Sequence, residues 1–294
     1  MIEIPKITLE QEQPQLDFAS LKSKLFINID EELTQPPIAL SIGTHKYKGG
    51  TYPTQFGSYG DFSCIVGASK SKKTFLKSLL IASYIGGNAY RYAPNIKGHD
   101  TKDKLVLEFD TEQSRYHCQK VFRRVAEIVG KNPDCYKPFS LRGLAVKERL
   151  QFIEYIFMES EYKNDIGLAS IDGVADLVTH VNDEEQSYAV AQKLLEWSEK
   201  SNSHIITVLH RNFQSNKPTG HLGSAVLKKA ETVVFIDKDD DLVQAVPEYT
   251  RNIPFEDFRY GIDEDWLPYV YTEEINVKDY TVPRTEQEKD EAPF

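Results

Sequence analysis

The residues best suited to chemistry lie in one short segment. It reads Gly-Ala-Ser-Lys-Ser-Lys-Lys-Thr and runs from Gly67 to Thr74. The apolar run Phe62–Val66 precedes it, and the helix-forming run Phe75–Ala82 follows it. A strand, a tight loop and a helix in this order are typical of a loop that binds nucleotide phosphates, because backbone amides and a helix N-terminus both attract anions. The segment is therefore a candidate phosphate loop.

In a loop of this kind a lysine reaches the β- and γ-phosphates, and a hydroxyl group binds Mg²⁺. Lys73 and Thr74 stand at those two positions. The residues expected to bind ATP are Gly67, Ala68, Ser69, Lys70, Ser71, Lys72, Lys73, Thr74 and Phe75. Lys72 departs from the pattern, which has glycine there; a lysine fits if the backbone is nearly helical, and it adds positive charge beside the phosphates. The alternative is a Lys- and Ser-rich surface turn in front of a helix.

Two acidic residues follow strand-like runs. Glu112 comes just after 104–109, and hydrolysis of a γ-phosphate needs a carboxylate that orients or deprotonates the attacking water. Asp172 ends the apolar run 167–171, where it would hold Mg²⁺ directly or through water. The plainer alternatives are that Glu112 sits in the first turn of a helix and that Asp172 starts an ordinary turn before Gly173.

A third strand-like run, 204–209, also ends in polar groups. His210 there would contact the γ-phosphate and pass its presence to the following loop, or it simply ends the strand at the surface. The loop 211–220 is polar and basic with one aromatic residue. Arg211 and Lys217 would meet phosphates of single-stranded DNA while Phe213 stacks on a base, and a plain solvated loop is the alternative.

The order of these motifs resembles that of the RecA-like ATPases, in the branch that includes DnaB-type and RepA-type ring helicases and KaiC-like proteins. The motifs are the phosphate loop, Phe-Asp-Thr-Glu at 109–112, Ile-Asp-Gly-Val-Ala-Asp-Leu at 171–177, Val-Leu-His-Arg-Asn at 208–212 and Gly-His-Leu-Gly-Ser at 220–224. The resemblance covers roughly residues 35–272 and implies that Glu112 is the catalytic glutamate, that Asp172 is the Walker B acid and that His210 senses the γ-phosphate. It rests on motif order, because no single motif is perfect.

The same resemblance extends to Tyr-Thr-Arg-Asn at 249–252. In ring helicases the arginine of the corresponding stretch acts across a subunit boundary. Arg251 is therefore expected to be an arginine finger, in a homo-oligomer that forms a ring or a filament. Tyr249 departs from the lysine that is usual at its position.

These residues need a scaffold that brings strand ends together. Short apolar runs at 62–66, 104–109, 167–171, 204–209 and 232–236 predict buried parallel strands, and amphipathic patterns at 114–129, 146–162 and 184–202 predict helices between them. We therefore expect an α/β fold: a three-layer RecA-like P-loop domain with a mainly parallel central sheet, C-terminal antiparallel strands at 242–249 and 266–271, and an irregular N-terminal arm. The expected divisions are an arm or small β-rich lead-in at 1–60, an ATPase domain at 61–275 and an acidic, disordered tail at 276–294.

Composition limits the alternatives. The 294 residues carry a formal net charge of −10, which argues against a chain coated for nonspecific binding of nucleic acid but leaves room for a local basic contact. The three cysteines show no paired spacing and are expected to be reduced thiols. No apolar run is long enough to span a membrane and no secretion signal is visible, so we expect a cytoplasmic protein without membrane contact.

The function expected from the sequence is an ATP-binding and ATP-hydrolysing motor that acts on DNA in replication, recombination or mobilisation, with Mg²⁺ and a minimal helicase-like architecture. The alternative is a nucleotide-dependent switch or helicase loader that hydrolyses slowly or not at all and binds a protein partner. The acidic tail ending in Phe294 resembles the partner-docking tips of some replication proteins, and an inert solubilising tail is its plainer interpretation.

Overall fold

The computed structural model describes residues 16–211 and 220–272, and the chain divides into two compact units, Met1–Gln35 and Pro36–Phe294. In the first unit, α1 (Phe18–Leu25) begins after Asp17, whose carboxylate accepts hydrogen bonds from the amides of Ala19 and Ser20. No residue of α1 is buried. The elements that carry the expected site all belong to the second unit.

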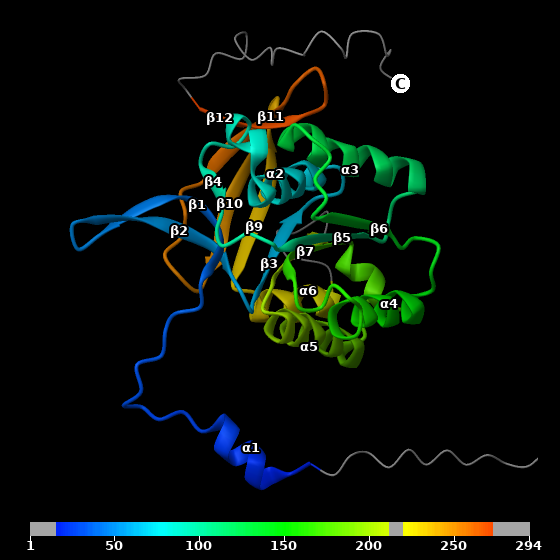
Figure 1. The fold of residues 1–294 in the computed structure, drawn as a ribbon. Helices are drawn as coiled ribbons and strands as arrows, with labels where there is room; N and C mark the ends of the chain where they lie inside the picture. The colour runs from blue at the N-terminus through cyan, green and yellow to red at the C-terminus, as the bar shows by residue number, and fades with distance from the viewer. Residues whose placement is uncertain (1–15, 212–219, 273–294) are drawn as a thin grey trace, which may run out of the picture. The chain divides into compact units, whose positions relative to one another are not determined.

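The second unit combines helices with two sheets (Figure 1). Its α-helices are α2 (Lys73–Ile85), α3 (Arg115–Val129), α4 (Val146–Met158), α5 (Glu184–Ser201) and α6 (Gly220–Lys229), and its 3₁₀ helices are η1 (Gly87–Arg91) and η2 (Val174–Leu177). Its strands are β1 (Ile38–Tyr47), β2 (Gly50–Ser58), β3 (Phe62–Gly67), β4 (Ile96–Gly98), β5 (Leu105–Asp110), β6 (Tyr136–Ser140), β7 (Ile166–Asp172), β8 (His204–His210), β9 (Thr232–Asp239), β10 (Leu242–Thr250), β11 (Phe258–Ile262) and β12 (Pro268–Tyr271).

The larger sheet has nine strands in the order β12-β11-β10-β9-β3-β8-β7-β5-β6. The strands from β9 to β6 are parallel to one another, whereas β9 through β12 pair in antiparallel fashion. The predicted α/β class with a mostly parallel sheet is therefore confirmed, as are the antiparallel C-terminal strands. Because each parallel strand returns through a helix, the carboxyl ends of β3, β5, β7 and β8 meet at one edge of the sheet.

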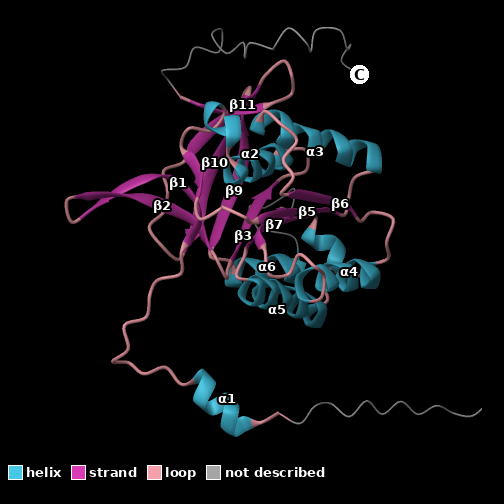
Figure 2. Cartoon of the chain, viewed as in Figure 1, coloured by secondary structure: helices cyan, strands magenta, loops and turns pink. Residues whose placement is uncertain are grey.

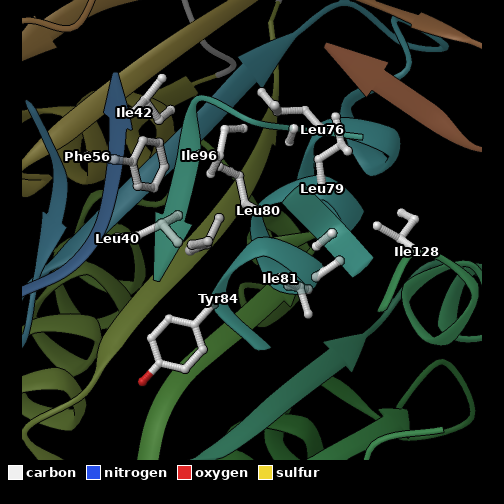
Figure 3. Packing of buried hydrophobic residues seen from close by; sticks show 14 of the residues in the cluster. Leu40, Ile42, Phe56, Leu76, Leu79, Leu80, Ile81, Tyr84, Ile96 and Ile128 are labelled. Atoms are coloured by element: carbon white, nitrogen blue, oxygen red, sulfur yellow. The ribbon is translucent and has the colours of Figure 1, made fainter. Parts of the chain in front are cut away.

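Helices cover both faces of this sheet (Figure 2). On one face, α2 and α3 bury Leu79, Leu80 and Val125 in a core that also includes β1 and β4; Figure 3 shows the α2 side chains packed beside those strands. On the other face, α4, α5 and α6 form a second core with residues such as Leu194 and Val226. The helices thus flank the sheet on both sides and fix the positions of its strand ends.

One residue of the predicted face of α5 lies outside the core. The helical pattern at 184–202 places Tyr188, Ala191, Leu194 and Leu195 on one face; Ala191 and Leu194 are buried and Leu195 packs partly buried against the core, but Tyr188 is 44% exposed. The buried side chains of α5 are Ser187, Val190, Ala191, Leu194, Trp197, Ser198 and Ser201. The indole of Trp197 stacks on the ring of Phe157 in α4, with ring centres 5.6 Å apart, and burying this large side chain turns the helix away from Tyr188.

Of the two interpretations of the segment before residue 61, the small β-rich lead-in agrees with the strands found there. Strands β1 and β2 form an antiparallel hairpin, and β1 also pairs with β4 to make a three-stranded sheet. The proposed tail at 276–294 lies outside the described residues. Within the described ranges, no helix combines the length and the apolar character that crossing a bilayer would require.

Candidate functional site

The loop between β3 and α2 is tightly built around Gly67. A Cβ atom at this position would lie 2.5 Å from Ser71 Oγ and 3.0 Å from the carbonyl oxygen of Ile236, so a larger residue would have to displace the Ser71 hydroxyl and press against the backbone of β9. Ser71 is buried, and its hydroxyl has no hydrogen-bond partner among the described residues. A buried hydroxyl without a partner is unfavourable, so a hydrogen-bonding ligand at this loop would satisfy it. Ser69 and Lys70, in contrast, are exposed.

Lys73 lies at the start of α2, with its ammonium group folded back into the loop. The Nζ atom donates to the carbonyl oxygens of Gly67 at 3.0 Å and Ala68 at 2.7 Å, and it lies 3.1 Å from Nδ1 of His210. Burial lowers the pKa of Lys73, an effect that the nearby carboxylates of Asp172 and Glu112 oppose. The ammonium is therefore partly desolvated and surrounded by exchangeable oxygen contacts, as a phosphate-binding lysine requires.

Asp172 ends β7 beside the first turn of α2. Its Oδ2 atom accepts hydrogen bonds from Thr74 Oγ1 at 3.4 Å and from Lys77 Nζ at 2.6 Å. A hydroxyl and a carboxylate on adjacent elements are oxygen donors of the kind that Mg²⁺ prefers. Across residues 16–211 and 220–272, no group of three or more His, Cys, Asp or Glu side chains is arranged to hold a metal. A Mg²⁺ ion at Thr74 and Asp172 would therefore need further oxygens from a ligand or from water.

Glu112 lies in the turn between β5 and α3 and faces the same loop. Its Oε1 atom is 3.4 Å from Nε2 of His210, which places the imidazole between Glu112 and Lys73. Because Lys73 can only donate, the hydrogen bond at Nδ1 assigns the ring proton to Nε2, which then points at the carboxylate. Helix α3 begins at Arg115, so Glu112 is not in its first turn, and that alternative is wrong.

Two neighbours fix the turn that carries Glu112. The carboxylate of Asp110 accepts hydrogen bonds from the amides of Glu112 at 3.0 Å and Gln113 at 2.8 Å. Gly173 has φ +86°, and a Cβ atom there would lie 2.6 Å from Glu112 Oε1. A residue larger than glycine would therefore both strain the backbone and displace the carboxylate.

A buried network of charged residues packs against Asp172. This network was not predicted from the sequence. The Nζ atom of Lys77 lies 2.6 Å from Glu108 Oε1 and 2.6 Å from Asp172 Oδ2, with Lys77 and Glu108 both fully buried. The contact with Glu108 is a charge contact outside hydrogen-bond geometry, and the other Glu108 oxygen accepts from the hydroxyl of Tyr136. Burial alone would lower the pKa of Lys77, but Asp172 and Glu108 outweigh it and hold that pKa above its ordinary value.

The sequence did contain a signal for this network. Lys77 interrupts the apolar face of a helix, and Glu108 interrupts an apolar strand. Charged residues are almost never fully buried unless they are paired. Once Lys77 and Glu108 are both assigned to the core, an ion pair between them is therefore expected.

The backbone at Lys72 is not the nearly helical one expected for a lysine. It has φ +69° and ψ 22°, in the left-handed region, and Lys70 has φ +60°. The hydroxyl of Tyr260 donates to the carbonyl oxygen of Lys72 at 3.1 Å and helps to hold this conformation. Left-handed geometry costs a residue with a Cβ atom roughly 1–2 kcal/mol, which is why the phosphate-loop pattern places glycine here.

Substituting Lys72→Gly is expected to stabilise the protein by up to about 1.5 kcal/mol. Relief of the left-handed strain is worth roughly 1–2 kcal/mol, and the extra freedom of glycine in the unfolded chain takes back about 0.5–1 kcal/mol. Urea unfolding would show a higher midpoint at an unchanged slope. Lys163→Gly is the matched control, because Lys163 is exposed and has no positive φ. A lower midpoint for Lys72→Gly would contradict the expectation.

Other predicted residues have partners away from the loop. Phe75 stacks on Trp266, with ring centres 6.5 Å apart, and the guanidinium of Arg124 lies 3.8 Å from its ring centre. Arg211 binds the carboxylate of Asp237 through both terminal nitrogens. Phe213 and Lys217, which we assigned to DNA contact, lie outside the described residues.

Arg251 does not lie near Lys73 in the same molecule. Its amide donates to the carbonyl oxygen of Glu231, just before β9, and its guanidinium pairs with Asp61 at 2.5 Å, just before β3. Arg251 is therefore at the amino end of the parallel strands, whereas the loop follows their carboxyl end. The separation is about the length of β3, on the order of 20 Å.

The structure thus brings Lys73, Thr74, Glu112, Asp172 and His210 together and leaves Arg251 at the opposite edge. A search of protein-family models finds no match to this chain, and a comparison with curated proteins finds none either.

Proposed function

We propose that this protein binds ATP with Mg²⁺ at the loop 67–74 and hydrolyses it, in a RecA-like domain that acts on DNA. The observation that carries the proposal is convergence: Lys73, Asp172 and Glu112 come from separate elements, yet all three lie within a few side chains of one another at the carboxyl edge of the sheet. Ligands of open parallel sheets bind at this edge.

The residues at this edge match the phosphates and the metal ion of a bound nucleoside triphosphate. Lys73 would exchange its contacts with loop carbonyls for phosphate oxygens, and Ser71 would gain the partner that it lacks. Thr74 and Asp172 would supply oxygens to Mg²⁺, which neutralises charge on the transferring phosphoryl group when it is bound. Glu112 would accept a proton from the attacking water, and the Nε2 proton of His210 would hold that carboxylate in place.

One observation favours the alternative, a nucleotide-dependent switch that hydrolyses ATP slowly. The left-handed lysine at position 72 adds strain and bulk to the loop that would have to close around the phosphates. Under this alternative the protein binds ATP and a protein partner but turns over slowly. A comparison of turnover with and without single-stranded DNA separates the two, because strong stimulation favours the motor and tight binding without turnover favours the switch.

The proposal is tested by thermal unfolding with Mg·ATP. At a ligand concentration about 100 times the Kd, binding stabilises by about 2.7 kcal/mol, which corresponds to roughly 5–10 °C for a domain of this size. Lys73→Ala is expected to abolish the shift, because it removes the cation from the loop. Lys163→Ala, at an exposed position, should keep it. Wild-type protein whose melting temperature does not respond to Mg·ATP would rule the proposal out.

A further inference from the structure

The hairpin β1–β2 extends beyond the sheet that anchors it (Figure 1). Its pairing with β4 involves only residues 40–42 of β1. From Thr44 paired with Pro53 to Tyr47 paired with Gly50, the two strands bind each other. The far end of the hairpin is therefore a projecting two-stranded ribbon.

The tip of this ribbon has a rigid turn. Lys48 and Gly49 form a two-residue loop, with φ +44° and +81°. Positive φ at both central residues is the geometry of the turn whose twist matches the flanking strands. The side chains around the turn are thus presented on a preorganised backbone, which lowers the entropy lost when a partner binds.

One face of the tip is aromatic. His45, Tyr47 and Tyr52 point to the same side, because alternate residues of a strand share a face and His45 pairs directly with Tyr52. The rings of His45 and Tyr52 have centres 6.2 Å apart, and the Tyr52 ring lies so close to Gly50 that a Cβ there would come within 2.7 Å of it. Tyr47 is 54% exposed and Tyr52 is 49% exposed, so both rings are open to solvent.

The charge of this region differs from that of the whole chain. The protein has 45 acidic residues and a net charge of −10, yet none of the residues 33–60 is Asp or Glu. The tip carries Lys46 and Lys48, both exposed. The Lys48 ammonium lies 5.2 Å from the centre of the Tyr47 ring. A cation therefore sits directly beside an aromatic surface, in a stretch free of acids.

We infer that the tip of the β1–β2 hairpin, residues 44–53, is a binding surface for single-stranded nucleic acid. Bases stack on the rings of Tyr47 and Tyr52, and a phosphate meets Lys48 beside the Tyr47 ring. Lys46 pairs with Thr51 and lies on the opposite face of the ribbon. Open aromatic rings with interleaved cations are the combination that single strands require, because every base has a π-face and every nucleotide a negative charge. Two lysines are too few for a membrane surface, which is recognised by clusters of four to eight basic residues. The tip also lacks the aliphatic side chains that a protein-binding surface would bury.

This surface adds a DNA contact to the proposed function but does not need nucleotide. Binding at the hairpin is measured without ATP, and Lys73→Ala is expected to leave it unchanged. Wild-type protein that binds an oligonucleotide through the hairpin but does not respond to Mg·ATP would therefore overturn only the proposed function. Wild-type protein that responds to Mg·ATP but does not bind through the hairpin would overturn only this inference.

The test is fluorescence anisotropy with a labelled oligothymidylate. Tyr47→Ala/Tyr52→Ala is expected to weaken binding at least about fivefold, since each stacked base is worth roughly 1–3 kcal/mol. Lys48→Ala should reduce the slope of log affinity against log salt by about 0.7, the value for one lost phosphate contact, whereas Lys46→Ala, on the other face of the ribbon, should leave the slope unchanged. Tyr47→Phe/Tyr52→Phe should retain wild-type affinity, because stacking needs the ring and not the hydroxyl.

Tyr155→Ala/Tyr188→Ala is the matched control, as these tyrosines of α4 and α5 are 46% and 44% exposed. It should bind like wild type. Affinity of Tyr47→Ala/Tyr52→Ala within twofold of wild type, or an equal loss in the control, would overturn the inference. Light scattering on Tyr47→Ala/Tyr52→Ala checks the oligomeric state. If the loss of binding accompanies dissociation of an assembly, the inference is also overturned, because the hairpin is then a contact between copies of the chain.

Discussion

Substituting Lys77→Ala is expected to destabilise the protein by about 3–5 kcal/mol, which corresponds to a melting temperature lower by roughly 6–20 °C. The change removes the cation from between Glu108 and Asp172 and leaves Glu108 fully buried without its charge partner. Coulomb attraction and desolvation nearly cancel in an intact buried pair, but a single buried charge keeps the whole desolvation penalty. Differential scanning calorimetry without nucleotide measures the effect directly.

Two further variants identify the cause. Lys77→Met/Glu108→Leu removes the charges of Lys77 and Glu108 at similar volume and is expected to recover part of the loss, since apolar replacements of buried pairs are often neutral or stabilising. Recovery is incomplete because Asp172 still lacks Lys77 and the hydroxyl of Tyr136 loses its acceptor. Lys200→Ala removes an exposed lysine that pairs with Glu196 at 2.6 Å, and its effect should stay within about 0.5 kcal/mol. If Lys77→Ala were as mild as Lys200→Ala, the buried network would not hold the site together.

Substituting Glu112→Gln is expected to lower ATP turnover about 10²- to 10⁴-fold while ATP binding persists. The amide is nearly isosteric with the carboxylate but cannot accept a proton from water. It also retains an oxygen for the Nε2 proton of His210, so the geometry between Lys73 and position 112 should survive. Single-turnover hydrolysis measures the chemical step, and the thermal shift with Mg·ATP measures binding.

Glu161→Gln provides the control, because Glu161 is exposed and far along the chain from the loop. It should match wild type in both measurements. Turnover that is unchanged in Glu112→Gln would exclude this carboxylate as the base, and slow turnover in both wild type and variant would favour the switch over the motor.

The sequence predicted the parallel strands and their polar ends well, because buried parallel strands are short continuous apolar runs that are easy to recognise. Asp172 and His210 each follow such a run, so their convergence could be inferred from topology alone. The hairpin β1–β2 was harder to predict, because Pro53 and several glycines gave that segment the composition of an irregular arm. Its Lys48-Gly49 turn needs a left-handed lysine, which no strong turn signal marks.

The remaining differences depended on tertiary contacts. The face of α5 is set by stacking between Trp197 and Phe157, which come from different helices and share no local pattern. The pairing of Lys77 with Glu108 joins α2 to β5, two elements whose contact the local sequence around Lys77 does not reveal. The left-handed backbone at Lys72 is likewise fixed from a distance, by the hydroxyl of Tyr260 on β11.

The position of Arg251 has a consequence for how copies of this chain could combine. The arginine and the loop 67–74 occupy opposite ends of β3. If Arg251 acts in a neighbouring molecule, as the RecA-like resemblance implies, each molecule has a donating end and an accepting end. If Arg251 completes the loop of a neighbour, an open row of n molecules contains n − 1 completed loops. The loop of the molecule at one end receives no arginine, because it has no neighbour on that side. Closure of the row into a circle supplies the missing one. The number of working centres would then report directly whether the assembly is closed.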